Sequence, residues 1–317
     1  MTDRESVPLL HRRLIFVIGK GGVGRSTVAA SFGLLSARRG ARTIVAEVSG
    51  RGELPELFGR DPQAGEVEMT GRLSAIQIDP ERALDEYLHE HLPLRMLADL
   101  VGATRLIGYL AAATPGLREL LSVGKLWELA QPERRIPDAS PYDLVIVDAP
   151  ASGHSLALLS APQAFARAAQ GGPVARQGQK IDAMLHDRSQ TALVAVARAE
   201  EAAVSELIEL RAKLRSELAL ELDALIVNAL PAAALRGEDA DALRSALDGA
   251  SELEAGARSA IERVLGEDRD AHAARTQVER LARELPDTPL IELPRCAGAE
   301  VGFSELEALS DRLAVVL

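Results

Sequence analysis

The sequence predicts an α/β protein with a mostly parallel, doubly wound sheet that has helices on both faces. Two observations predict this fold. Short apolar runs, each the length of one buried strand, recur along the 317 residues and alternate with longer segments of helical periodicity. The first run ends in a glycine-rich turn, GKGGVGRST at residues 19–27, that leads into a helical pattern. A glycine-rich turn between a strand and a helix is typical of this architecture.

Seven apolar runs are expected to form the strands of this sheet. The first, LIFVI, is apolar at every position, which is typical of a central parallel strand that is buried on both faces. The fourth, YDLVIVD, is the most distinct and ends in an aspartate. In chain order, the runs are residues 14–18, 43–48, 73–78, 142–148, 192–196, 224–227 and 289–293.

The segments between these runs have helical patterns. A helix over residues 26–39 follows the glycine-rich turn and stops before Gly40, a residue type that is common after the last helical turn. Residues 80–131 are too many for a simple crossover and have breaks at Pro93 and Pro115, so we expect a helical insertion. The other helical segments are residues 162–188, with a break at 171–173, and the charged segments 199–218 and 252–285.

The domain organisation follows from these patterns. Residues 1–13 are charged and contain Pro8, and we expect them to be a flexible leader. Residues 14–317 are expected to form a single domain, with a helical subdomain drawn from about 80–135 and 160–190. A hydrophobic content of 47% in a chain of this length is enough to bury a substantial core.

Composition argues against several classes of protein. The formal net charge of -11 argues against a nucleic-acid-binding surface, which is normally basic. The single cysteine, Cys296, permits neither a disulfide within the chain nor a paired-cysteine metal site. No stretch of about 18 apolar residues without charges is present, and the N-terminus lacks a signal-peptide core. We therefore expect a cytoplasmic protein without stable membrane insertion and without a nucleic-acid partner.

The glycine-rich segment fits two phosphate-binding motifs. Gly19, Gly21 and Gly24 match G-x-G-x-x-G, the dinucleotide fingerprint, and Glu47 lies about where the ribose-binding acid is expected. The same residues also read G-x-x-x-x-G-R-S, a P-loop motif with arginine at the lysine position. In both motifs, glycines let backbone N–H groups curl round an anion at a helix N-terminus.

Three features favour a triphosphate over NAD or FAD. Lys20 and Arg25 place two cations in the loop, which a triphosphate needs and a bridging pyrophosphate does not. Ser26 and Thr27 follow at once, where a hydroxyl group can ligate Mg²⁺. Asp148 ends an apolar strand, as the Mg²⁺-associated carboxylate of a P-loop protein does. The sequence therefore predicts a P-loop NTPase fold.

Further motifs resemble one family. The order K-G-G-V-G, with Lys20 second in the loop, resembles the deviant Walker A motif of the ArsA, Get, MinD and ParA group of dimeric ATPases, the SIMIBI class. VDAPASGHS at residues 147–155 is similar to the second switch of the ArsA and Get branch. LDALIVNAL at 222–230 and LPR at 293–295 resemble its adenine-binding segments. The resemblance extends from about residue 14 to 317, and is to bacterial ArsA-like anion-transporting ATPases with paired, non-identical subunits.

The resemblance implies roles for individual residues, with ATP and Mg²⁺ as ligands. Lys20 would reach across a dimer interface to the partner's phosphates, and Asn228 and Pro294 would contact the adenine. Ser26 and Asp148 would hold the Mg²⁺. The catalytic positions would be Lys20, Arg25, Ser49 and Asp148. The nucleotide would be bound by Gly19, Lys20, Gly21, Gly22, Val23, Gly24, Arg25, Ser26, Thr27, Asn228 and Pro294.

Two departures from the family pattern bear on catalysis. Arg25 replaces the usual lysine, and a planar guanidinium is not equivalent to an ammonium at a tight phosphate site. Ser49 takes the place of the first-switch aspartate that orients the attacking water, and a serine is no base. Glu47 and Glu53 lie nearby and are candidate substitutes. We therefore expect either slow hydrolysis or hydrolysis that a partner subunit completes.

The partner and the cargo stay open at this stage. The dimer is expected to be a homodimer or a heterodimer with a related ATPase subunit, acting on a protein or a small anion. A lone Cys296 cannot supply a metalloid-binding cluster, and only four methionines argue against a methionine-rich groove. Two alternatives to an active switch ATPase are a nucleotide-binding regulatory subunit beside an active paralogue and a positioning protein on DNA or membrane. The acidic charge counts against the second alternative.

Overall fold

Within the part of the chain that the structure describes, eight strands form one sheet in the order β3-β4-β2-β5-β1-β6-β7-β8. Adjacent strands are parallel throughout, except that β3 is antiparallel to β4. The expected α/β fold with a mostly parallel sheet is confirmed. The computed structural model describes residues 8–48, 52–63, 65–91, 116–134, 139–168, 172–232, 235–249, 254–296, 298 and 301–317.

All seven apolar runs of the sequence form strands, and β3 is an additional one. The strands are β1 (Leu14–Gly19), β2 (Thr43–Glu47), β3 (Glu66–Thr70), β4 (Leu73–Gln77), β5 (Leu144–Asp148), β6 (Thr191–Arg198), β7 (Ala224–Leu230) and β8 (Leu290–Pro294).

Helices connect most of these strands. A short 3₁₀ helix at Leu9–His11 precedes β1. The α-helices are α1 (Arg25–Arg38), α2 (Glu53–Leu57), α3 (Pro80–His91), α6 (Leu117–Leu129), α7 (Ser152–Ala168), α8 (Gly172–His186), α9 (Glu201–Leu218), α10 (Gly237–Gly249), α11 (Ala255–Glu284) and α12 (Phe303–Val316).

One helix boundary differs from the sequence expectation. A helix was expected from residue 162, because proline favours the first turn of a helix. Instead, α7 begins at Ser152 and contains Pro162 in its interior. The helix therefore starts directly after the short loop that follows Asp148, and no further segment separates the two. The expected breaks at Pro93 and Pro115 lie outside the described residues.

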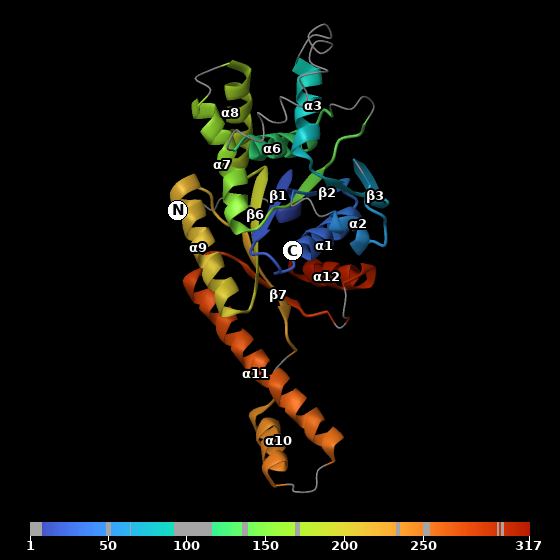
Figure 1. Ribbon diagram of the computed structural model, residues 1–317, viewed down its shortest axis with the longest axis vertical. Helices are drawn as coiled ribbons and strands as arrows, with labels where there is room; N and C mark the ends of the chain where they lie inside the picture. The colour runs from blue at the N-terminus through green and yellow to red at the C-terminus, as the bar shows by residue number, and fades with distance from the viewer. Residues whose placement is uncertain are drawn as a thin grey trace.

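The helices cover the sheet on both faces. In Figure 1, α1, α2 and α12 lie on one side of the strands, and α7, α9 and α11 lie on the other. The helices α3, α6, α7 and α8 pack together beyond one end of the sheet, and α10 and α11 extend beyond the opposite end. At about 1.5 Å per residue, the 30 residues of α11 span roughly 45 Å. No helix among the described residues has the length and apolar content to cross a membrane.

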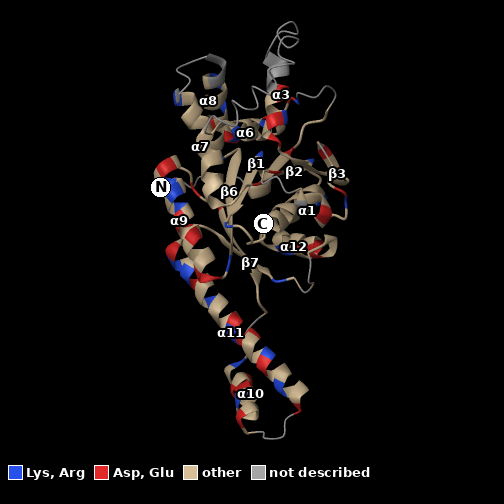
Figure 2. Ribbon diagram, viewed as in Figure 1, with Lys and Arg blue, Asp and Glu red and all other residues tan. Residues whose placement is uncertain are grey.

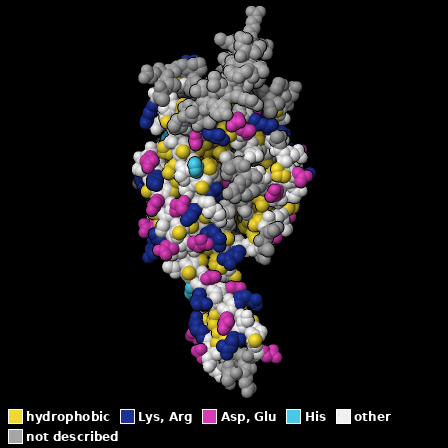
Figure 3. All heavy atoms as spheres, in the orientation of Figure 1, with side chains coloured by type: hydrophobic (Ala, Val, Ile, Leu, Met, Phe, Trp, Pro, Cys, Tyr) yellow, Lys and Arg dark blue, Asp and Glu magenta, His cyan; other side chains and the backbone are white. Residues whose placement is uncertain are grey.

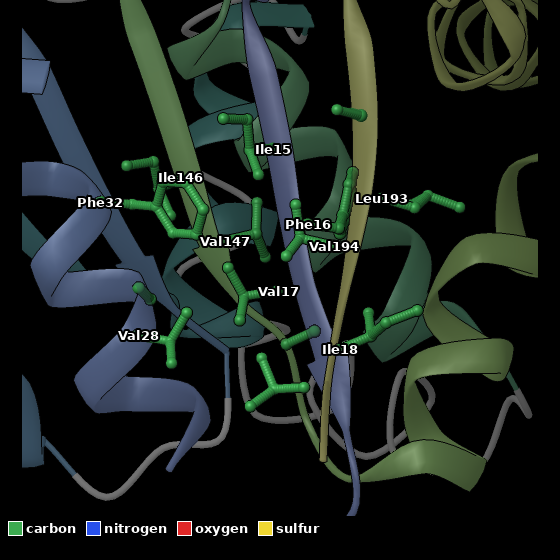
Figure 4. Packing of buried hydrophobic residues seen from close by; sticks show 14 of the residues in the cluster. Ile15, Phe16, Val17, Ile18, Val28, Phe32, Ile146, Val147, Leu193 and Val194 are labelled. Carbon is green, nitrogen blue, oxygen red and sulfur yellow. The ribbon is translucent and has the colours of Figure 1, made fainter. Parts of the chain in front are cut away.

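The core lies where β1 passes between β5 and β6. Every residue of β1 is buried, as expected for a central parallel strand. Burial of apolar surface contributes roughly 25 cal/mol per Å², so this layer is a principal source of stability. Figure 4 shows side chains of three adjacent strands and of α1 in close packing, among them Ile15, Phe16, Val17, Ile18, Ile146, Val147, Leu193, Val194, Val28 and Phe32.

The strand order places the carboxyl end of β1 at a topological switch point. From β1 the chain runs out to β2, β3 and β4 on one side, returns through β5, and then adds β6, β7 and β8 on the other side. In open α/β sheets, ligands bind at such a point, in the crevice outside the carboxyl ends of the strands. The glycine-rich loop occupies this position, because it follows β1 directly.

Candidate functional site

Two glycines of the loop between β1 and α1 are required by close approaches of the chain. A Cβ atom on Gly19, at φ +150°, would lie 2.3 Å from the carbonyl oxygen of Val196. A Cβ atom on Gly24, at φ +88°, would lie 2.2 Å from Nδ2 of Asn228. The loop therefore packs tightly against β6 and β7. Since α1 begins at Arg25, its first backbone N–H groups have no partner within the helix and can face an anion.

Ser26 and Asp148 meet beneath this loop. Ser26 Oγ donates a hydrogen bond of 2.6 Å to Oδ2 of Asp148, which is 1% exposed at the end of β5. The contact exists because β5 is the parallel neighbour of β1, so their carboxyl ends lie side by side. A hydroxyl and a carboxylate oxygen are ligand types that suit Mg²⁺. The two residues that the sequence predicted for the metal are therefore adjacent.

Arg25 holds backbone oxygens of two loops. Its Nε donates to the carbonyl oxygen of Ala149 at 3.0 Å, and one terminal nitrogen donates to those of Gly19 at 2.8 Å and Lys20 at 2.6 Å. Burial lowers the pKa of the guanidinium, and the carboxylate of Asp148, 3.8 Å from Nε, opposes that shift. Arginine stays protonated in proteins, so the site keeps its positive charge. Arg25 braces the phosphate loop against the loop after β5.

Lys20 points to a carboxylate of α9. Its Nζ lies 3.3 Å from Oε2 of Glu206, and the two side chains are 43% and 36% exposed. Oε1 of Glu206 accepts a hydrogen bond from Ser152 Oγ. Sequence reasoning missed Glu206, since it is one of several glutamates on a charged helix and no motif marks it.

Asn228 and Pro294 lie on neighbouring strands, β7 and β8, at the same edge of the sheet. Asn228 is 8% exposed, and its Nδ2 donates to the carbonyl oxygen of Val23 at 3.0 Å. The side-chain amide thus holds the phosphate loop against β7. Pro294 pairs in register with Leu230 on β7, and the N–H of Arg295 donates to the carbonyl oxygen of Leu230 at 2.7 Å. Of the two residues that were expected near the adenine, Asn228 contacts the loop, and Pro294 is placed by its pairing with Leu230.

The first-switch segment is described only in part. Ser49 lies outside the described residues, as does the side chain of Glu53. Glu47 is 2% exposed and pairs in register with Asp148, and its Oε1 accepts a hydrogen bond of 2.9 Å from the backbone N–H of Gly52. One role of Glu47 is therefore to fix the start of α2.

A cleft of about 720 Å³ lies next to both loops that follow β2 and β5. It is large enough for a small organic molecule or a peptide side chain. Its lining combines Val48, Pro150 and His154 with charged and polar side chains at the start of α3 and in the first two turns of α6. The latter residues are Asp79, Arg82, Arg118, Glu119 and Ser122.

Comparisons with known proteins agree with this geometry. Residues 12–170 match the family model described as "Anion-transporting ATPase". The chain is 32% identical over 325 residues to "ATPase BagA" of Mycobacterium tuberculosis, which covers 95% of this chain and 92% of that protein. It is 33% identical to "Putative arsenical pump-driving ATPase" of Halobacterium salinarum over 50% of this chain and 25% of that protein. It is 28% identical to "ATPase GET3C" of Arabidopsis thaliana over 51% of this chain and 44% of that protein.

The matched region contains the whole glycine-rich loop, Asp148 and the start of α7. These are the elements that the structure brings together at the carboxyl end of β1. With a P-loop fold and a relative that is similar over nearly the full length, the chain belongs to the anion-transporting ATPase family, the ArsA and GET3 type.

Proposed function

We propose that this protein is an ATP-binding, dimeric switch ATPase in which nucleotide drives closure of the dimer on a cargo or partner. The observation that carries the proposal is the contact of Ser26 with Asp148 directly beneath a glycine-rich loop at a helix N-terminus. That arrangement presents backbone donors for phosphates and oxygen ligands for Mg²⁺ at one point.

Each part of the site has a task in this proposal. The loop amides from Gly21 to Gly24 bind the phosphates, and Asn228 keeps the loop in shape. Ser26 ligates Mg²⁺ and Asp148 accepts hydrogen bonds from its surroundings. When bound, Mg²⁺ offsets the charge of the transferring phosphoryl group. Lys20 reaches the phosphates bound by a second subunit, which makes the site complete only in the dimer.

The cargo is proposed to act through the cleft and the helices above it. The lining of the cleft includes Val48, Pro150 and His154, which lie in the segments after β2 and β5. A change in either segment therefore reshapes the cleft walls. We propose a helical subdomain from about 80–135 and 160–190, of which α3 and α6 contribute to the lining of this cleft, and a cytoplasmic location.

Turnover and affinity of the pure protein test this proposal. With Mg²⁺ present, we expect ATP binding together with measurable hydrolysis. If the protein bound no ATP with Mg²⁺ present, the proposal would be wrong in its first step.

A second candidate function has support from Arg25. Its guanidinium contacts three backbone carbonyl oxygens, those of Gly19 and Lys20 at the phosphate loop and that of Ala149 after β5, which is a bracing role. Together with serine at position 49, this favours a nucleotide-binding subunit that hydrolyses ATP weakly or not at all beside an active paralogue. The double variant Arg25→Lys, Ser49→Asp tests it. A gain in turnover of tenfold or more over the wild-type chain supports the regulatory subunit, and an unchanged rate opposes it.

A further inference from the structure

Glu206 contacts the two loops that surround the phosphate site. One carboxylate oxygen lies 3.3 Å from Nζ of Lys20, and the other accepts a hydrogen bond from Oγ of Ser152. Lys20 belongs to the phosphate loop, and Ser152 is the first residue of α7, in the segment that follows Asp148. A single side chain of α9 thus links the phosphate loop to the start of α7.

The backbone of α9 holds Glu206 in this position. The neighbouring residues Val204, Leu207 and Leu210 are buried, so the helix is anchored against the body of the protein. Helix α9 also packs against β6, which borders β1. The carboxylate is consequently presented by an anchored helix, whereas Lys20 belongs to the phosphate loop and Ser152 is the first residue of α7. If the contact breaks, the loops are the parts that move.

A phosphate group and the Glu206 carboxylate compete for the ammonium group of Lys20. Both are anions, so they repel each other when they approach the same cation. Lys20 carries three N–H donors at one point, and its long side chain can turn from one anion to the other. The ion pair is partly exposed, and such pairs are weak enough for a ligand to break.

We propose that Glu206 is a positioning residue that holds Lys20, and that phosphate binding releases Lys20 from it. This inference rests on the proposed ATP-binding function. When Lys20 is released, the hydrogen bond from Ser152 is the contact of Glu206 that remains among those described. The release therefore also affects the segment after β5, to which Ser152 belongs. A phosphate that draws Lys20 away from Glu206 thereby also changes the surroundings of Ser152 at the start of α7.

Affinity for nucleotide tests the release. The Glu206→Gln variant loses the charge but keeps an oxygen that can accept the bond from Ser152. We expect it to bind a non-hydrolysable ATP analogue with Mg²⁺ about two- to fivefold more tightly than the wild-type chain, the range given by exposed ion pairs. Glu209→Gln is the matched control, because Glu209 is an exposed carboxylate on the same helix.

A double-mutant cycle separates release of Lys20 from a general loss of negative charge. In a Lys20→Ala background, we expect Glu206→Gln to leave the affinity unchanged. An equal gain in both backgrounds, a gain for Glu209→Gln of the same size, or weaker binding by Glu206→Gln would each overturn the proposal.

Chemical labelling tests the contact between Lys20 and Glu206 in the absence of nucleotide. An amine-acylating reagent, followed by mass spectrometry, measures how readily Lys20 reacts in the nucleotide-free protein. We expect Glu206→Gln to raise labelling of Lys20 at least twofold and Glu209→Gln to leave it unchanged. Unchanged labelling in both variants would overturn the proposal even if ATP binds normally. If the wild-type chain binds no ATP, the proposed function fails, while labelling still decides whether Glu206 holds Lys20.

Discussion

Arg25 makes a set of contacts that a lysine cannot reproduce. Its guanidinium donates along two directions, to Ala149 on one side and to Gly19 and Lys20 on the other. A lysine ammonium offers its donors from a single point and cannot span the same oxygens. The arginine therefore stabilises the loop through contacts that depend on its planar, forked guanidinium.

Replacement of Arg25 should weaken the folded state. We expect Arg25→Ala to lower the free energy of unfolding by about 1–3 kcal/mol, because it removes three part-buried hydrogen bonds from a charged donor to backbone carbonyl oxygens. Urea denaturation measures this change. Arg39→Ala is the matched control, since Arg39 follows the last residue of α1, is exposed and makes one long hydrogen bond of 3.3 Å to Ala314. Equal effects of the two substitutions would contradict the bracing role.

Removal of the Ser26 hydroxyl should weaken the part of ATP binding that depends on Mg²⁺. We expect Ser26→Ala to lose about tenfold or more in affinity for ATP with Mg²⁺, as metal sites do when a ligand contact is lost, and to change little in EDTA. Ser31→Ala is the control, because Ser31 lies on the same helix but donates to the carbonyl oxygen of Thr27. A similar loss with and without Mg²⁺ would mean that Ser26 serves the loop alone.

The sequence allowed some of these residue contacts to be predicted. Ser26 and Asp148 follow neighbouring parallel strands, and the carboxyl ends of such strands meet at one edge. The contact of Glu206 with Lys20 could not be predicted in this way, because tertiary packing decides which turn of α9 faces Lys20. Asn228 was expected to contact the adenine, which stays a prediction, and its bond to Val23 could not be foreseen because it depends on how closely β7 approaches the loop.

At the scale of elements, the strands were predictable because they are continuous apolar runs. The edge strand β3 is different: EVEMT has one buried residue, and its polar positions resemble a loop. It is recognisable only from its antiparallel pairing with β4. The start of α7 was also missed, because Pro162 resembles a helix start and the loop after Asp148 gives no sign that it turns directly into a helix.

Helices α8 and α9 are joined by His186. Its two ring nitrogens each lie 2.8 Å from a carbonyl oxygen, those of Asp182 and Leu218. A neutral imidazole donates from one nitrogen, whereas the protonated ring donates from both. Burial opposes the charge, but the two carbonyl groups and the Asp182 carboxylate together raise the pKa of His186. The protonated ring therefore stabilises this connection.

A dependence of stability on pH follows from the raised pKa of His186. Its contribution is fully present below the unfolded value of about 6.5 and is lost as the pH rises through the folded value. We expect His186→Gln to destabilise the protein more at about pH 6 than at about pH 8, measured by urea denaturation. His272→Gln is the control, because Nδ1 of His272 has one carbonyl partner and the side chain is 65% exposed. A pH-independent effect of His186→Gln would contradict the assignment.

At the scale of the whole molecule, charge is distributed rather than concentrated. Acidic and basic side chains alternate along α9, α10 and α11 (Figure 2), and both signs are interspersed on the face drawn in Figure 3. Association of two subunits is thus expected to depend on specific contacts such as that of Lys20, and less on overall charge. The helix α11 was expected from the charged segment 252–285, whereas α10 and the extension of the pair beyond the sheet were not predicted, because a charged periodicity indicates a helix but not its direction.

Dimer formation should require both nucleotide and Lys20. In sedimentation velocity with Mg²⁺ and a non-hydrolysable ATP analogue, we expect the wild-type chain to shift toward the mass of a dimer. We expect Lys20→Ala to remain a monomer, since it cannot reach the phosphates of a second subunit. A nucleotide-independent dimer, or a dimer of equal strength in the variant, would contradict this role.

Calorimetric titration of the pure protein with ATP, with Mg²⁺ and with EDTA, tests the central claim most directly. The proposed site predicts saturable binding of one ATP per chain that is tightened by Mg²⁺, because Ser26 and Asp148 lie together beneath the loop. Binding that is absent in both conditions, or that is unaffected by Mg²⁺, would contradict it.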